Sequence, residues 1–285
     1  MDSALNVPQL LRQYGLTPDK RLGQHFLVDP VALGRIVEAA DLSPRAQVLE
    51  VGPGVGSLTV ALAPHCRRLV AVEVDPRFRL VLERVLHPYP HVEVIFGDIL
   101  AQDPAALMGD EPYLVVANLP YYITGAVVRH LLTARRRPRR MVLTVQREVA
   151  ARITATPGQM SLLSVSVQVF GEPRVVARVP RGAFYPLPEV ESAVVRVEMY
   201  PEPRVPEAQL PVFFRVARAG FAQRRKNLRN ALSAGLGLTK QEVEAVLRQA
   251  AIEPTRRAES LNMEEWQRLT ALFVQRLVGE GKAKG

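Results

Sequence analysis

An amide, a proline-fixed carbonyl and an aromatic ring follow one another just past an apolar run at residues 113–117. In an open α/β sheet, ligands bind at the carboxyl ends of the strands. The Asn118 side-chain oxygen and the Leu119 carbonyl can accept both N–H bonds of an exocyclic amine. Pro120 biases its predecessor toward an extended backbone, and Tyr121 can stack on a flat base. These residues predict a site that grips the amino group of adenine; the alternative is an ordinary turn after a strand.

Glycines follow an earlier apolar run, residues 47–51, in the spacing G-x-G-x-G. Glycine lets the backbone approach a ligand closely at the start of a helix. Gly52 and Gly54 therefore predict a ligand-binding turn before a helix at 57–63. A glycine pattern alone is shared by many nucleotide-binding folds. Here the G-x-G-x-G spacing, with Glu50 before it, differs from the G-x-G-x-x-G of dinucleotide sites.

Acidic residues follow the next two predicted strands. Glu73 and Val74 end the run 69–74, about 20 residues after the glycines, where a carboxylate can grip a ribose diol. Asp98 and Ile99 follow the run at 92–96, where an acid and a backbone amide can read an adenine. S-adenosylmethionine suits this set, with its methionine part over the glycines. Helix N-capping is the alternative role for either acid.

These residues, in this order, resemble the adenine-N6 dimethyltransferases of ribosomal RNA, and most closely the dimethyladenosine transferases of the small subunit. The basic segment K-R-L-G-Q-H-F-L at 20–27 is similar to the family motif that wraps the methionine end of the cofactor. The resemblance assigns cofactor contacts there to Gln24, His25, Phe26 and Leu27. The family usually has Asn at the position of His25, although imidazole can also donate and accept hydrogen bonds.

Two further motifs carry the resemblance. Residues 184–195 resemble the family motif F-x-P-x-P-x-V-x-S, which implies that Phe184 walls the target-adenine pocket opposite Tyr121. A core phenylalanine before an ordered proline loop is the alternative. Residues 221–232 resemble a signature of the small-subunit enzymes. That signature argues against the large-subunit enzymes, which have a different C-terminal lobe.

The chain alternates short apolar runs with amphipathic segments, which predicts an α/β fold with a parallel, doubly wound sheet. With the runs at 141–146, 175–179 and 193–199, the sheet reaches the seven strands typical of Rossmann-like class I methyltransferases. The proline-rich stretch 201–206 is the expected linker. We expect a methyltransferase domain with an N-terminal extension over residues 1–200. A small all-helical RNA- or ribosome-binding domain is expected over residues 207–285.

The formal charge is +9, which is typical of proteins that bind polyanions. Residues 204–257 hold 11 Lys or Arg and 4 Asp or Glu. A solvated surface is the ordinary explanation of such runs. Because we place the first basic cluster beside the adenine pocket, we expect both clusters to contact RNA phosphates. The expected contacts are Arg135, Arg136, Arg137, Arg139 and Arg140, and then Arg224, Arg225, Lys226 and Arg229.

Composition excludes several classes. No apolar stretch reaches the roughly 18–20 residues of a membrane span, and the first residues lack the pattern of a secretory signal. The single cysteine, Cys66, fits a reducing cytoplasm, and no Cys/His cluster indicates a bound metal. We expect a cytoplasmic monomer that binds neither membrane nor metal.

The resemblance implies N6,N6-dimethylation of two adjacent adenosines in the 3′-terminal hairpin loop of 16S rRNA, within the small ribosomal subunit. The sulfonium donor is already activated, so orientation and the N6 hydrogen bonds are what the protein must supply. Two alternatives stay open. The chain can be a large-subunit rRNA methyltransferase, or a non-catalytic assembly or transcription factor on the same fold.

Overall fold

The computed structural model describes residues 5–223 and 225–279, and their contacts divide the chain into two compact units. The first unit comprises Met1–Ala151 and Pro173–Met199, and the second comprises Arg152–Glu172 and Tyr200–Gly285. The division expected at 200–207 therefore differs by one segment, because residues 152–172 group with the C-terminal helices.

The first unit is built on a seven-stranded sheet, as the sequence predicted, and its strand order is β4-β3-β2-β5-β6-β9-β7. Strands β4, β3, β2, β5 and β6 pair in parallel, and β9 pairs with β6 in the antiparallel sense. β2 is buried along its whole length, and most of its residues are apolar, as expected for a central strand of a parallel sheet. The strands are β2 Gln47–Val51, β3 Arg68–Glu73, β4 Val92–Phe96, β5 Leu114–Asn118, β6 Arg140–Gln146, β7 Gly171–Val179 and β9 Ser192–Met199.

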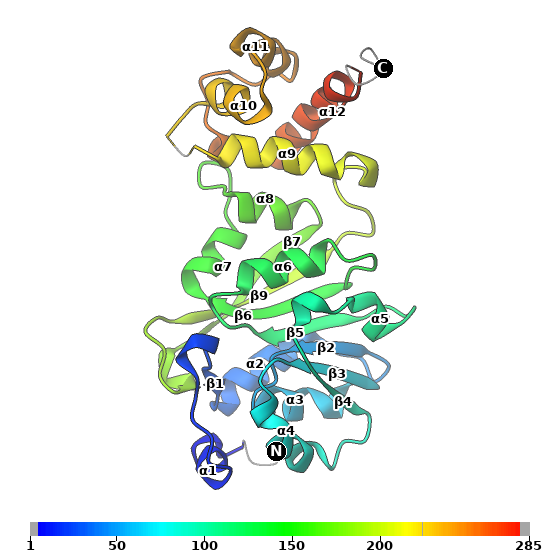
Figure 1. Ribbon diagram of the computed structural model, residues 1–285, viewed down its shortest axis with the longest axis vertical. Helices are drawn as coiled ribbons and strands as arrows, with labels where there is room; N and C mark the ends of the chain where they lie inside the picture. The colour runs from blue at the N-terminus through cyan, green and yellow to red at the C-terminus, as the bar shows by residue number, and fades with distance from the viewer. Residues whose placement is uncertain (1–4, 224, 280–285) are drawn as a thin grey trace. The chain divides into compact units, whose positions relative to one another are not determined.

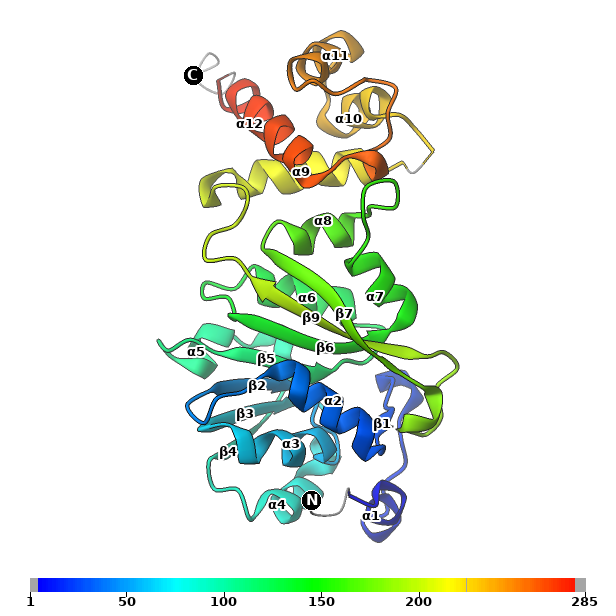
Figure 2. The same cartoon turned by 180° about the vertical axis from the view of Figure 1, so that it is seen from behind.

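Helices cover both faces of this sheet. α2 and α3 lie on the face seen in Figure 2, and α6 lies on the face seen in Figure 1. Helix starts follow capping chemistry: the Asp29 side chain caps α2, and Pro30 is its first residue. The helices up to this boundary are α1 Val7–Gln13, α2 Pro30–Ala40, α3 Ser57–Leu62, α4 Arg79–Leu86, α5 Pro104–Met108 and α6 Thr124–Leu132, and α7 Arg147–Ile153 crosses it.

A small two-stranded sheet was not predicted. β1 (Phe26–Leu27) pairs in the antiparallel sense with β8 (Phe184–Tyr185), with Leu27 opposite Phe184. Two-residue strands separated by more than 150 residues leave no periodic signal. This pairing brings the N-terminal basic segment beside the F-x-P-x-P motif.

The second unit is helical, with Trp266 fully buried in it. A Cβ added to Gly235 would lie 2.5 Å from the Cβ of Ala219, so only glycine permits the close approach of α10 to α9. Within the described residues, no helix has both the length and the apolar character needed to cross a membrane. The helices are α8 Leu162–Gln168, α9 Leu210–Phe221, α10 Leu228–Leu236, α11 Lys240–Gln249 and α12 Met263–Gly279.

Candidate active site

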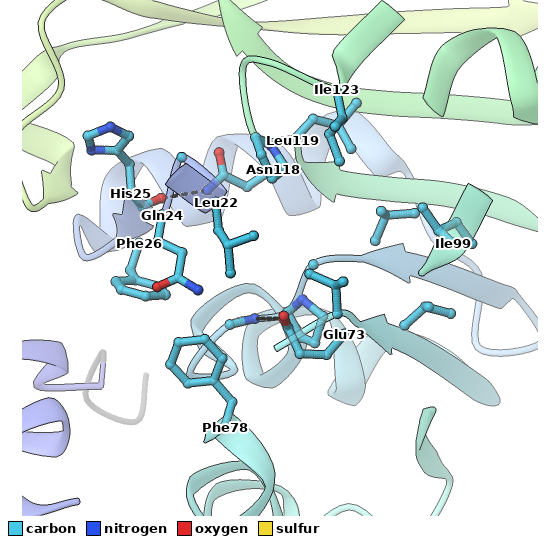
Figure 3. A pocket seen from close by; sticks show the side chains of 18 of the residues that line it. Leu22, Gln24, His25, Phe26, Glu73, Phe78, Ile99, Asn118, Leu119 and Ile123 are labelled. Atoms are coloured by element: carbon cyan, nitrogen blue, oxygen red, sulfur yellow. Dashed lines mark hydrogen bonds between the residues drawn. The ribbon is translucent and has the colours of Figure 1, made fainter. Parts of the chain in front are cut away.

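A cavity of about 230 Å³ opens at the carboxyl ends of β2, β3, β4 and β5 (Figure 3). Each of these strands delivers a polar group or a glycine turn to it, because parallel strands end at the same edge of the sheet. Most of the predicted cofactor and catalytic residues line this cavity. They are Gln24, His25, Phe26, Leu27, Gly52, Gly54, Glu73, Val74, Asp98, Ile99, Asn118, Leu119, Pro120 and Tyr121.

The glycine turn after β2 has a backbone that other residues rarely adopt. Gly52 has φ +72° and Gly54 has φ +59°. A Cβ on Gly54 would lie 2.8 Å from two ring atoms of Phe26, so this glycine also makes room for an aromatic wall. That ring meets Phe78 edge to face, with centroids 5.6 Å apart. The turn and the two rings together form one end of the cavity.

Glu73 is buried and tied to the glycine turn. Its Oε2 accepts a hydrogen bond from the Gly54 amide at 2.9 Å, and its Oε1 accepts from the Asp75 amide at 2.8 Å (Figure 3 shows the first). Burial raises the pKa of this carboxyl. Each carboxylate oxygen keeps a second lone pair, so Glu73 can still accept from a ribose hydroxyl.

Asp98 combines its capping and cavity-lining roles. One oxygen, Oδ1, accepts from the Leu100 amide at 2.9 Å, as an N-cap does. Its side chain is exposed at the cavity, and Oδ2 accepts no hydrogen bond within the described part of the chain. Asp98 therefore acts as an N-cap through one oxygen, and its second oxygen remains available to a ligand.

Asn118 has its amide orientation fixed by a backbone carbonyl. Its Nδ2 donates to the His25 oxygen at 2.9 Å (Figure 3). A carbonyl can only accept, so the amide nitrogen must face it and the Oδ1 atom points the other way. Neither that oxygen nor the Leu119 carbonyl accepts a hydrogen bond from any described residue. Both residues that carry the predicted acceptors line the cavity.

Tyr121 is held from two sides. Its hydroxyl lies 2.9 Å from Ser192 Oγ, and its ring stacks with that of His25 at a centroid distance of 5.7 Å and 23° between planes. Burial raises the pKa of this phenol. Sequence reasoning missed the role of Ser192; its only signal was its place at the end of the F-x-P-x-P-x-V-x-S motif.

Two predicted site residues are not on the cavity. Phe184 is buried in a core cluster with Leu33 and Ile36 of α2 and pairs with Leu27, and it does not line this cavity; that it walls the adenine pocket stays a prediction. Glu50 is fully buried in β2 and does not line the cavity. Its carboxylate oxygens have no hydrogen-bond partner among the residues described, and burial, reinforced by Glu73, raises its pKa to about 8.

Apolar residues of the cavity were also missed. Leu22, Phe78, Leu100 and Ile123 line it but were not predicted. Phe78, Leu100 and Ile123 lie a few residues after a strand end whose polar residue was predicted, so their position on the same turns was the available signal.

The first basic cluster lies away from the cavity, which corrects the expectation that it flanks the adenine pocket. In the β5–β6 register Leu114 pairs with Arg140, whereas Asn118 at the cavity pairs with Thr144. The cluster therefore lies at the amino end of β6, on the opposite edge of the sheet. Several of its arginines have partners in the protein: Arg136 with Asp110, Arg137 with the Leu132 carbonyl, and Arg140 with Glu198.

The second basic cluster precedes and begins α10. Arg225 and Lys226 are exposed, and Arg229 pairs with Glu244 at 3.1 Å. Arg224 lies outside the described residues. The Asn227 side chain caps α10, so part of the predicted signature serves the helix itself.

Comparison with known proteins identifies relatives over nearly the whole chain. Residues 16–274 match the family described as ribosomal RNA adenine dimethylase. The ribosomal RNA small subunit methyltransferase A of Dehalococcoides mccartyi (strain 195) is 46% identical over 96% of this chain and 97% of its own length. The protein of the same name from Pelotomaculum thermopropionicum is 43% identical over 94% and 95%.

Solved structures agree on the fold. The 23S rRNA methyltransferase ErmE superposes with a TM-score of 0.70 at 32% identity, covering 87% of this chain and 98% of that one. A dimethyladenosine transferase from Plasmodium falciparum superposes with a TM-score of 0.74 at 24% identity, covering 90% and 98%.

Proposed function

The chain belongs to the ribosomal RNA adenine dimethylase family, and we propose that it dimethylates N6 of two adjacent adenosines in the 3′-terminal hairpin loop of 16S rRNA. It is an rRNA adenine-N6 dimethyltransferase that uses S-adenosylmethionine. The pair of open acceptors, Asn118 Oδ1 and the Leu119 carbonyl, supports this proposal most directly. They lie on one cavity wall beside the Tyr121 ring.

The cavity fits the methyl donor in shape and in chemistry. Gly54 lets the Phe26 ring pack against the glycine turn, and the backbone amides and rings there suit the methionine part. Glu73 would accept from the ribose hydroxyls, and Asp98 with the Ile99 amide would hold the adenine. When bound, S-adenosylmethionine supplies a methyl group on a positively charged sulfur. No protein base is needed to activate that group.

The residues on the acceptor wall act on the target base. Asn118 Oδ1 and the Leu119 carbonyl would each accept one N6 hydrogen, which draws the nitrogen lone pair out of conjugation with the ring. With the N6 lone pair freed in this way, the base would accept the methyl group that the bound donor supplies, and an N6 proton would pass to water. Preorganised acceptors of this kind contribute most of the stabilisation when charge moves in the transition state.

The target base must leave its stack to reach this wall. Enzymes that modify a base inside a helix extrude it, and an unpaired loop lowers that cost. Higher identity to the small-subunit enzymes than to ErmE supports 16S over 23S rRNA as the substrate. An rRNA substrate also supports a cytoplasmic location and the small subunit as the binding partner.

The exposed basic residues before α10 support a role of the helical part, residues 207–285, in RNA binding. Arg225 and Lys226 are exposed, and neither has a carboxylate partner among the described residues, so both can reach phosphates. Arg135 and Arg139 are also exposed, but they lie on the sheet edge opposite the cavity. We therefore rank Arg225 and Lys226, which precede α10, first as phosphate contacts.

Tritiated methyl transfer tests the substrate. The purified protein would be incubated with labelled S-adenosylmethionine and with small subunits from a strain that lacks the modification. Large subunits from the same cells serve as the comparison. We expect label in 16S rRNA alone and N6,N6-dimethyladenosine at two adjacent positions by nucleoside mass spectrometry.

Other outcomes identify the alternatives. Label in 23S rRNA would make the protein a large-subunit enzyme. Binding of small subunits without transfer, while the donor still binds, would make it a non-catalytic assembly factor.

A further inference from the structure

The buried carboxylate of Asp75 holds the start of the basic segment, residues 20–27, beside the end of β3. Asp75 is 4% exposed, and its Oδ2 accepts a hydrogen bond from Gln24 Nε2 at 2.8 Å. Gln24 Oε1 in turn accepts from the Asp19 amide at 2.8 Å, so both polar atoms of this side chain have a partner. Apart from bonds to the neighbouring Asp19, the Asp75 contact is the one hydrogen bond that residues 20–24 make to the rest of the chain that the structure describes.

Arg77 fixes the carboxylate that receives Gln24. Its Nε donates to both oxygens of Asp75, at 2.9 and 3.0 Å, and its Nη2 donates to Oδ2 at 2.6 Å. These hydrogen bonds hold the pKa of the Asp75 carboxyl below its ordinary value, so the group stays an acceptor for Gln24. Asp75 also caps the 3-10 helix Pro76–Phe78 through Oδ1, which is the ordinary structural role of such a residue.

The backbone of Asp75 continues this connection to the residues that would hold the methyl donor. Its amide donates to Glu73 Oε1, and Glu73 Oε2 accepts from the Gly54 amide. One series of hydrogen bonds thus runs from the basic segment through the end of β3 to the glycine turn. Gln24 and Glu73 line the cavity, whereas Asp75 and Arg77 do not. Figure 3 shows the Gln24 side chain directed to the same side of the cavity as Glu73.

We propose that Asp75 is a positioning residue for the methyl donor: by holding Gln24, it keeps the start of the basic segment in place as a wall of the donor cavity. This inference rests on the proposed function, in which the cavity binds S-adenosylmethionine. Leu22 and Gly23 line the cavity beside Gln24, so a displacement of this part of the segment changes the wall that the donor meets. The Gln24 amide keeps a second hydrogen and a second lone pair, so it can contact the donor while Asp75 holds it.

Two single variants and their combination test the contact itself. Asp75→Asn keeps an oxygen for the helix cap and turns an amide NH2 group, in place of the acceptor, toward Gln24. Gln24→Glu places a second carboxylate against Asp75, which repels it. In the double variant the donor and the acceptor are exchanged, so the hydrogen bond can form again and the new carboxylate can pair with Arg77. Thermal unfolding of each variant shows whether it folds.

Two measurements report on the positioning. Calorimetric titration gives the Kd of S-adenosylmethionine, which we expect to rise by about 10-fold in each single variant and to return to within about 3-fold of wild type in the double variant. Limited trypsin digestion of the protein without the donor should cut after Arg21 faster in each single variant, because the segment is then held less firmly. The single-turnover rate at saturating donor should stay within about 3-fold for Asp75→Asn, since Asp75 does not touch the reacting groups.

Asp103→Asn is the matched control. Asp103 caps α5 through Oδ1 as Asp75 caps its own helix, each is followed by a proline, and Asp103 does not line the cavity. This variant should leave both the Kd of S-adenosylmethionine and the trypsin cleavage after Arg21 unchanged. An equal change in the Asp103 and Asp75 variants would mean that loss of a cap, and not loss of the Gln24 contact, is what is measured.

Other results would also overturn the inference. An unchanged Kd in Asp75→Asn would leave Asp75 a helix cap alone. A loss in the double variant as large as the product of the two single losses would mean that Gln24 and Asp75 act independently. If Gln24→Glu does not fold, the Kd and the digestion of Asp75→Asn against Asp103→Asn decide. Wild type that binds the donor but transfers no methyl group to small subunits would refute the proposed function and leave the effect of Asp75 on the Kd measurable.

Discussion

The Tyr121 hydroxyl lies 2.9 Å from Ser192 Oγ, although 71 residues separate them in the chain. Ser192 begins β9 and is buried, so the hydroxyl that it offers is fixed by the sheet. This contact gives a physical reason for the serine that ends the F-x-P-x-P-x-V-x-S motif. It anchors the ring on which we place the target base.

We predict that Ser192→Ala lowers kcat/KM for unmodified small subunits by about 3- to 10-fold, since one hydrogen bond contributes about 0.5–1.5 kcal/mol. Tyr121→Phe removes the other half of the same contact. The double variant should be little worse than the poorer single variant, because both changes remove one interaction. Fully additive losses in this cycle would mean that the two hydroxyls act independently.

Asn118 should be needed for transfer and not for donor binding. Its replacement by Ala removes one N6 acceptor, which we expect to lower the single-turnover rate by about 100-fold or more. The Kd of S-adenosylmethionine should change by only a few-fold. Asn118→Asp is the matched variant: it keeps an oxygen but loses the Nδ2 donor to His25, so it should also be slow. Wild-type turnover in Asn118→Ala would remove this residue from the mechanism.

Much of the fold was predictable because parallel strands leave strong local signals. Residues suited to ligand binding follow the apolar runs at β2, β3, β4 and β5. The structure brings these residues to one cavity. The same strand order fixes the edge of the sheet on which each turn lies. The arginines at 135–140 lie before and at the start of β6. The same rule therefore places them at the edge of the sheet opposite the cavity.

The rest depended on long-range contacts. Nothing local shows that Leu27 lies opposite Phe184, and a phenylalanine beside prolines reads equally as a pocket wall or as core. His25 has the same ambiguity, because its three contacts involve residues 93 or more positions away. A single sequence therefore identifies the residues of the site better than it assigns a role to each.

Gly54 and Gly52 provide a matched pair for the donor side. Both have positive φ, so Ala at either position is strained, by roughly 1–2 kcal/mol. Only at Gly54 does the new Cβ meet another group, the Phe26 ring at 2.8 Å. We predict that Gly54→Ala weakens S-adenosylmethionine binding by about 10-fold more than Gly52→Ala does, measured by calorimetry. Equal losses would mean that backbone strain alone matters and that the aromatic wall does not.

Glu50 should make stability depend on pH. Burial raises its pKa from 4.5 to about 8, so between these values the folded state holds a proton that the unfolded state has lost. The free energy of unfolding must then fall as pH rises through this window. Glu50→Gln stays neutral, so we expect its Tm to exceed that of wild type increasingly toward pH 8, by at least about 3 °C.

The control for this prediction is Glu83→Gln, which removes a carboxylate from an exposed position of α4. That variant should follow the wild-type Tm across the same pH series. If Glu50→Gln also runs parallel to wild type, the buried carboxyl is not the group that titrates.

The exposed cations before α10 should carry more of the RNA affinity than those before β6. Arg225→Glu with Lys226→Glu, and Arg135→Glu with Arg139→Glu, each reverse two exposed positive charges and so change the net charge equally. If the first pair contacts two phosphates, its reversal should reduce the slope of log affinity against log salt by about 1.4–1.8. We expect less than half that change from the second pair, and an unaltered Kd for S-adenosylmethionine in both.

Binding of small subunits at several salt concentrations gives both slopes. Both variants change the net charge equally, so a difference between them reports where the RNA binds. A larger effect from the Arg135 and Arg139 variant would mean that the RNA contacts the edge of the sheet opposite the cavity.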